Sequence, residues 1–158
     1  MNARSADLKR AFEAAGFTNV VTVLSSGNVA FDARARSSTV LEKKAEAAMR
    51  EVLGSAFLTF VRPVATLEAM IASDPYRGLR VDANAKRIVT FVRKPPAVKL
   101  ELPIERDGAR LLRFQDGVLY GAYLPTPKGP VFMALIERAF GKEQTTRTWQ
   151  TVGRVARA

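Results

Sequence analysis

The sequence predicts an α+β protein made of two small subdomains. Apolar residues at helical spacing alternate along the chain with β-branched runs, and pairs of these runs are joined by Gly-containing turns. The stretch 74–85 is rich in Pro, Gly, Asn and Asp, and its residues 76–85 are predicted to be a linker. The length of 158 residues suits one compact domain or two small halves that share a core.

The first half, residues 1–75, is predicted to begin with a helix and a hairpin. Apolar residues fall at positions i, i+3, i+4 and i+7 after Ser5, which can cap the helix, and Gly16 can end it. The β-branched run at 20–24 predicts a strand, because such side chains pack well in a pleated sheet, and residues 29–31 resume the strand pattern. The turn residues between these strands predict that they form a hairpin.

A second helix, a strand and a short helix are predicted to follow. Thr39 and Glu42 have the spacing of a capping box, in which two side chains bond free N–H groups at the start of a helix. Gly54 can end this helix. The run 57–61 predicts a third strand, and the apolar pattern at 66–73 predicts a short helix.

The second half, residues 86–158, is predicted to hold a strand, a hairpin and two helices. Asp116-Gly117 is a favoured turn between two paired strands. Pro130 suits the first position of a helix, and Thr145 or Thr146 can cap the final one. The predicted elements are strands at 87–93, 109–115 and 118–124, a helix at 131–140 and a final helix that carries Trp149.

The order of elements in each half resembles part of the split β-α-β unit of ferredoxin-like folds. The first half follows the order α-β-β-α-β, which lacks only a leading strand. We therefore predict two ferredoxin-like subdomains at 1–75 and 86–158, joined by the linker 76–85, with the leading strand of the first one missing.

Composition excludes several kinds of chemistry, because the chain contains no cysteine and no histidine. Disulfides, thiolate nucleophiles and imidazole catalysis are excluded, and we predict no metal and no cofactor. The carboxylate pairs Glu42/Glu46 and Glu101/Glu105 are predicted to be solvated. No apolar run reaches the length of a transmembrane helix, and the N-terminus has no signal-type apolar core. We expect a cytoplasmic protein with no membrane partner.

The charge of the chain is its most prominent global feature. Lys and Arg number 25 against 15 Asp and Glu, which gives a net charge of +10. Seven of these cations lie between Arg77 and Lys99, where Asp82 is the one acidic residue. Such a charge attracts nucleic acid, nucleotides and other polyanions. The alternative is a basic surface with no dedicated partner.

One predicted strand face combines cations with an aromatic ring. Arg87, Phe91 and Arg93 share a face of the strand at 87–93, because side chains alternate between the two sides, and Lys94 follows directly. Such a face can stack on the bases of a nucleic-acid strand and neutralise its phosphates. The alternative is that these are flanking cations on a solvated edge.

The strongest candidate for a small anion site is Thr145-Thr146-Arg147. These residues precede the final predicted helix, and free N–H groups at a helix start attract anions. The forked guanidinium of Arg147 can add two hydrogen bonds to phosphate or carboxylate. The alternative is a threonine cap followed by a surface arginine.

Two further turns could contact a ligand. Ser25, Ser26 and Asn28 could present hydroxyls and an amide, although Gly and Asn are also the residues that a tight turn needs. Lys128 lies in a Pro-Lys-Gly-Pro turn before a predicted helix, where the prolines remove the N–H groups that a phosphate cradle requires.

Two segments carry a resemblance to a known family. Residues 23–31, VLSSGNVAF, resemble the QSGNVVF signature of the bacterial domain-of-unknown-function family 1697, and residues 145–152, TTRTWQTV, resemble its TTRNWNTV ending. The resemblance implies two ferredoxin-like subdomains and no established activity. Family members usually begin with a further strand and a Gly-rich turn ahead of the first helix. Without that strand, an exposed sheet edge predicts a homodimer.

We predict a non-enzymatic module that binds an anionic ligand, either a nucleic-acid strand or a nucleotide. One alternative is a small enzyme that acts on an anionic metabolite between the two subdomains. Another is a structural or dimerising protein whose charge is incidental.

Overall fold

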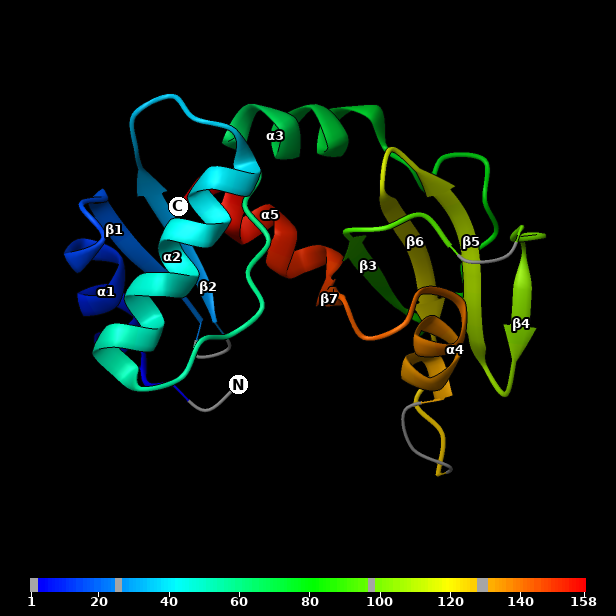
Figure 1. Ribbon diagram of the computed structural model, residues 1–158. Helices are drawn as coiled ribbons and strands as arrows, with labels where there is room; N and C mark the ends of the chain where they lie inside the picture. The colour runs from blue at the N-terminus through cyan, green and yellow to red at the C-terminus, as the bar shows by residue number, and fades with distance from the viewer. Residues whose placement is uncertain (1–2, 25–26, 97–98, 128–130) are drawn as a thin grey trace. The chain divides into compact units, whose positions relative to one another are not determined.

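Five helices and two antiparallel sheets make up the part of the chain that the computed structural model describes, residues 3–24, 27–96, 99–127 and 131–158 (Figure 1). The predicted mixture of helices and strands is confirmed. The chain divides into two compact units. The first comprises Met1–Ala69 with Gly153–Ala158, and the second comprises Met70–Val152.

The first unit packs two helices against a two-stranded hairpin. Strands β1 (Thr18–Val23) and β2 (Asn28–Asp32) form the predicted hairpin. Helices α1 (Ser5–Ala14) and α2 (Ser38–Leu53) supply most of the core. The fully or nearly buried residues of this core are Leu8, Ala11, Phe12, Phe17, Val20, Ala45 and Met49.

The helix starts differ from the predicted caps. Helix α1 has Arg4 at its N-cap, with no side-chain cap hydrogen bond, so Ser5 lies inside the first turn. Helix α2 begins two residues before the predicted capping box, since Ser37 is the N-cap and its Oγ accepts from the Val40 amide at 3.3 Å. Gly54 ends α2 in the left-handed conformation, as predicted.

The strand predicted at 57–61 is not formed, because two carboxylates of α2 take up its amide groups. The Thr59 amide donates to Glu46 Oε1 at 3.0 Å, and the Val61 amide donates to Glu42 Oε2 at 2.8 Å. Carboxylates at positions i and i+4 share a helix face, while alternate amides of an extended segment point the same way. The prediction that Glu42 is solvated is wrong, since its exposure is 7%.

Replacing Glu42 with alanine is expected to destabilise the protein by about 1–3 kcal/mol, because a buried amide loses its acceptor. Urea unfolding followed by circular dichroism measures this change. Glu51, which is exposed on the same helix, provides the control, and Glu51→Ala should change the free energy of unfolding by less than about 0.5 kcal/mol. Equal effects of the two substitutions would show that the amide contact contributes nothing.

The second unit is built on a five-stranded sheet with the strand order β4-β5-β6-β3-β7. Every neighbouring pair is antiparallel. The strands are β3 (Lys86–Val92), β4 (Ile104–Arg106), β5 (Ala109–Gln115), β6 (Val118–Tyr123) and β7 (Gln144–Thr148). The predicted hairpin at Asp116-Gly117 is confirmed, and both turn residues have positive φ, at 52° and 76°.

Helix α4 (Val131–Phe140) covers one face of this sheet (Figure 1). Leu135 and Ile136 of α4 pack on Ile88, Leu111 and Leu119 of three neighbouring strands. The apolar stripe predicted at 131–140 therefore faces the sheet. The predicted starting residue, Pro130, lies outside the described residues.

Strand β7 replaces the predicted helix cap. Thr145 and Thr146 pair with Phe91 and Thr90 of β3, so neither residue caps a helix. Helix α5 (Trp149–Arg157) starts after them, and the Thr148 hydroxyl accepts from the Thr151 amide at 3.1 Å. Threonine favours both strands and caps, and pairing with β3 decides between the two here.

The start of the predicted linker packs against the second sheet. Helix α3 (Val64–Ser73) precedes it, and Tyr76 has an exposure of only 3%. The Tyr76 hydroxyl lies 2.8 Å from the carbonyl oxygens of both Ile88 and Gly121. Residues 76–85 lie within the second unit.

Candidate functional site

Four arginine side chains share the face of the second sheet opposite α4, which we call the arginine face. Ile88 packs under α4, so alternation along β3 places Arg87 and Val89 on the arginine face. Arg147 of β7 lies directly opposite Val89 and therefore lies on the arginine face as well. The four residues are Arg87, Arg110, Arg113 and Arg147.

A bulge in β5 brings two of these arginines together. Arg110 lies opposite Ala122 and Arg113 lies opposite Tyr120, with one extra residue in β5 between them. Strict alternation would place residues 110 and 113 on opposite faces, but the bulge puts both on the arginine face. Arg110 and Arg113 are not predictable as site residues from the sequence, because no local pattern marks the bulge.

Arg87 and Arg147 are diagonal neighbours on adjacent strands. Val89 lies opposite Arg147, and Arg87 is two residues before Val89 on the same face. Such diagonal neighbours lie about 7–8 Å apart, and the Arg147 guanidinium itself turns along β7 toward Thr145. The fold thus unites two candidates that the sequence analysis had assigned to separate sites.

Three aromatic side chains, those of Tyr76, Tyr120 and Trp149, pack together next to these arginines. Tyr76 contacts Tyr120 and Trp149 edge to face, with ring centroids 5.9 and 5.6 Å apart. The Arg87 guanidinium carbon lies 5.0 Å from the centroid of the Tyr76 ring, which holds the exposed cation over an aromatic face. Burial raises the pKa of Tyr120 to about 12 and the pKa of Tyr76 further above its usual value.

Two arginines of the face hold the neighbouring segment in place. Arg113 Nη1 donates to the Pro75 carbonyl at 2.7 Å, and Arg110 Nη1 donates to the Arg80 carbonyl. Arg110 Nε also lies 3.7 Å from Glu105. Arg110 and Arg113 therefore anchor the chain around Tyr76.

Arg147 is held in its own strand. Its Nη1 lies 2.8 Å from both the Thr145 hydroxyl and the Thr146 carbonyl oxygen. Burial lowers the pKa of the Arg147 guanidinium from its usual value, although an arginine side chain stays charged in proteins.

The other predicted nucleic-acid contacts lie in different environments. Phe91 has an exposure of 8%, so its ring is not open for stacking on a base. Arg93 and Lys94 are exposed beyond the end of β3, and Lys94 Nζ forms an ion pair with Glu143 at 3.0 Å. That contact lowers the pKa of the Glu143 carboxyl.

The predicted turn sites are only partly within the described structure. Asn28 is buried at the start of β2, and its Nδ2 donates to the Val23 carbonyl at 3.2 Å. This contact bridges the end of the first hairpin. Ser25, Ser26 and Lys128 lie outside the described residues.

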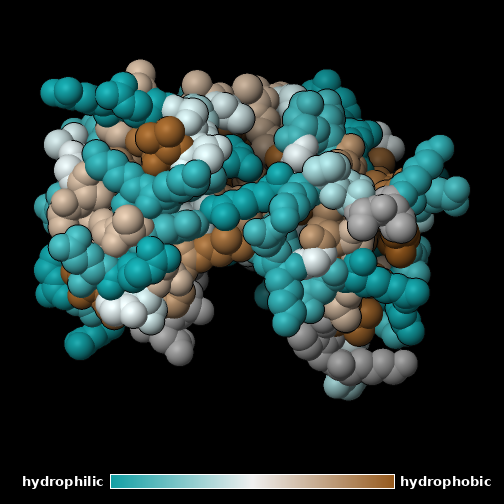
Figure 2. Space-filling view, viewed as in Figure 1, coloured by the Kyte–Doolittle hydropathy of each residue, from teal (hydrophilic) through white to brown (hydrophobic). Residues whose placement is uncertain are grey.

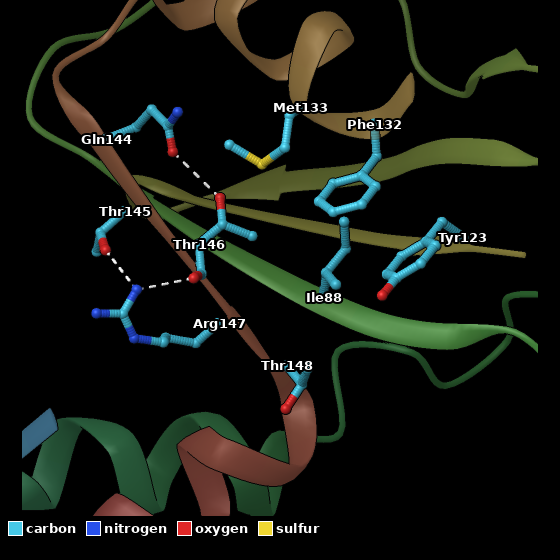
Figure 3. Close-up of a pocket in the computed structure, with 9 residues that line it drawn as sticks. All are labelled: Ile88, Tyr123, Phe132, Met133, Gln144, Thr145, Thr146, Arg147 and Thr148. Carbon is cyan, nitrogen blue, oxygen red and sulfur yellow. Dashed lines mark hydrogen bonds between the residues drawn. The ribbon is translucent and has the colours of Figure 1, made fainter. Parts of the chain in front are cut away.

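A groove of about 380 Å³ lies on the other side of β7, next to α4 (Figure 3). Phe132 and Met133 of α4 and Tyr123 of β6 line it with Ile88. Its polar lining comes from consecutive residues of β7, which are Gln144, Thr145, Thr146, Arg147 and Thr148.

A family profile described as "Protein of unknown function (DUF1697)" matches residues 2–120, most of the chain. The chain belongs to this family. No curated protein and no solved structure matches it. The match confirms the family resemblance from the sequence analysis and assigns no activity to this DUF1697 protein.

The candidate site of this DUF1697 protein extends past the matched region. Strand β3 and most of the second hairpin lie within residues 2–120, which include Arg87, Arg110 and Arg113. Strand β7 with Arg147, helix α4 and the groove between them lie almost wholly beyond it.

Two further kinds of site are not found in the part of the chain that the structure describes. Within it, no group of three or more acidic side chains is placed to hold a metal ion. None of its helices has the length and apolarity needed to cross a membrane.

Proposed function

We propose that this DUF1697 protein is a non-enzymatic module that binds an anionic ligand, a nucleic-acid strand or a nucleotide, at Arg87 and Arg147. The observation that carries the proposal is their position as diagonal neighbours on one sheet face, although they lie 60 residues apart in the sequence. Each guanidinium group can bind a phosphate through forked hydrogen bonds, so two of them on one face suit successive phosphates of a ligand.

Both arginines are supported in a way that favours binding. The ring of Tyr76 lies under the Arg87 guanidinium, and Tyr76 is itself fixed by hydrogen bonds to the sheet. The Thr145 hydroxyl and the Thr146 carbonyl orient Arg147. A cation that is already held in place loses less conformational entropy when a ligand binds.

The charge of the whole chain adds attraction at longer range. The net charge is +10, and Figure 2 shows hydrophilic residues over much of the visible surface. Such a field raises the rate at which an anion meets the protein and falls with ionic strength.

The test is a fluorescence anisotropy titration of labelled single-stranded and duplex oligonucleotides at about 50 and 200 mM salt. Arg87→Ala combined with Arg147→Ala should weaken binding at least about tenfold and reduce the log–log salt slope by about 1–2. The control combines Arg106→Ala with Arg138→Ala, which removes two exposed cations from β4 and α4 of the same unit.

The control should change the affinity less than the site variant. Equal losses in the two double variants would show that general charge, not the Arg87/Arg147 site, carries binding. No binding to any oligonucleotide at low salt would restrict the proposal to nucleotides, which a thermal-shift screen of nucleoside phosphates then tests. A screen without any shift would reject it.

We also propose that the second unit is a reduced ferredoxin-like subdomain. Strand β6 lies between β3 and β5, as a split β-α-β unit requires, and β7 follows α4 back to β3. Strand β4 takes the place of the first connecting helix in the described residues.

A further inference from the structure

We infer that the groove between α4 and β7 binds an uncharged planar ring, the base of the nucleotide whose phosphate lies at Arg87 and Arg147. The inference rests on the proposed function, because it assigns the second half of the same ligand. It is carried by the walls of the groove, by its polar groups and by its position across one edge strand from Arg147.

The walls of the groove offer a flat aromatic surface. Phe132 stacks on Tyr123 with ring centroids 4.3 Å apart and an angle of 20° between the planes. Met133 and Ile88 complete the apolar lining. Aromatic rings and methionine sulfur both pack favourably on a planar ring, whichever base carries it.

Apart from Arg147, the polar groups of the groove are uncharged, and hydrogen bonds hold two of them in place. Thr146 donates to Gln144 Oε1 at 3.1 Å, so its hydroxyl oxygen accepts from the Thr90 hydroxyl at 2.8 Å. The first contact orients the Gln144 amide so that its NH2 group is the remaining donor. Within the described residues, neither this NH2 group nor the Tyr123 hydroxyl has a hydrogen-bond partner. Both are available to the acceptors and donors on the edge of a base.

The charged group of the groove lining is turned away from the aromatic wall. Figure 3 shows the Arg147 guanidinium next to Thr145, away from Phe132 and Tyr123. A phosphate inside the groove would therefore lose its hydration without gaining a cation. An uncharged ring does not have this cost.

Strand β7 connects the two halves of the site. Thr146 and Arg147 are adjacent in sequence, so their side chains leave opposite faces of the strand, one toward the groove and one toward the arginine face. Because β7 is the edge strand of the sheet, no further strand of the described residues separates the two sides. One ligand can pass around this edge with its base in the groove and its phosphate on the arginine face.

The test uses adenosine and cytidine, which are uncharged at pH 7, and their 5′-monophosphates, followed by NMR shifts of the Gln144 side-chain amide and, in the variants, of the Thr146 backbone amide. Nucleosides should bind with one-to-one saturation and with less than about a twofold change in Kd between about 50 and 200 mM salt. Phe132→Ala should weaken nucleoside binding about 5- to 100-fold. Gln144→Leu should weaken it about three- to tenfold.

Two controls separate the groove from the phosphate site. Glu137→Ala alters an exposed residue of α4 and should leave nucleoside binding unchanged. Arg147→Ala should weaken the monophosphates and leave the nucleosides within about twofold. If Phe132→Ala fails to fold, Gln144→Leu still decides the outcome, because Gln144 is a half-exposed edge residue.

The outcomes distinguish the two proposals. One outcome is that nucleosides cause no shift at Gln144 while the monophosphates bind through Arg147. That result would overturn the groove inference and leave the proposed function standing. The other outcome is that nucleosides bind while neither the monophosphates nor the oligonucleotides do. That result would overturn the proposed function and with it the assignment of the groove to a nucleotide base.

Discussion

Tyr76→Ala is expected to destabilise the second unit by about 3–5 kcal/mol, the range for removing a buried aromatic ring. The substitution deletes ring contacts with Tyr120 and Trp149 and the hydrogen bonds of the hydroxyl to two strands. Trp149 is the one tryptophan in the sequence, so its fluorescence during urea unfolding reports on this unit.

A pair of phenylalanine variants isolates the hydroxyl. Tyr76→Phe should cost about 1–3 kcal/mol, since two buried carbonyls lose their shared donor. Tyr123→Phe is the matched control, because no described residue bonds the Tyr123 hydroxyl, and it should cost less than about 0.5 kcal/mol. If Tyr76→Ala destabilised the protein no more than the control does, residues 76–85 would act as a linker, as the sequence predicts.

The same tyrosine makes stability depend on alkaline pH. Burial raises the pKa of Tyr76 above its usual value of 10, so the folded state favours the neutral phenol. In the unfolded chain the Tyr76 phenol ionises near pH 10. The contribution of this residue to the free energy of unfolding is therefore complete below pH 10 and declines as the pH rises above it. Tyr120, with a pKa of about 12, adds a loss between pH 10 and 12. Tyr76→Phe should show a flatter decline above pH 10.

Gly121→Ala is expected to destabilise the second unit by about 1–3 kcal/mol through overpacking. A Cβ atom at position 121 would lie 2.7 Å from the Arg110 carbonyl oxygen, which belongs to the backbone of the adjacent strand and cannot rotate away. Strand β5 would have to move next to its bulge, where Arg110 and Arg113 join the arginine face.

Gly153→Ala is the control, and it is expected to change the free energy of unfolding in the opposite direction. It lies inside α5, and a Cβ atom there would meet the flexible end of Arg157 at 3.1 Å. Alanine should stabilise the helix by about 0.5–1 kcal/mol, because glycine is a poor helix former. Thermal unfolding followed by circular dichroism measures both changes. A neutral Gly121→Ala would show that the strands can separate at the bulge without cost.

Local chemistry predicted several elements correctly. The Asp116-Gly117 turn was predictable because positive φ at both positions selects those residues, and the flanking strands follow from it. The apolar stripe at 131–140 forms α4, and Gly54 ends α2 as its sequence position indicates. These features depend on residues close together in the chain.

Long-range contacts decided the predictions that failed. Residues 57–61 have the composition of a strand, but Glu42 and Glu46 occupy the amides of Thr59 and Val61. Thr145 and Thr146 look like helix caps, but β3 pairs with them. In both cases the local sequence allows two structures, and a partner distant in the sequence selects one of them.

The amino-acid sequence was sufficient to predict the α+β composition, the family, the net charge of +10 and the lack of cysteine and histidine chemistry. Only the tertiary structure placed Arg87 beside Arg147 and, through the bulge, Arg110 beside Arg113 on one face. Side-chain alternation is a local property that a sequence displays. Strand order and register arise from pairing between distant segments, and the position of a binding site depends on them.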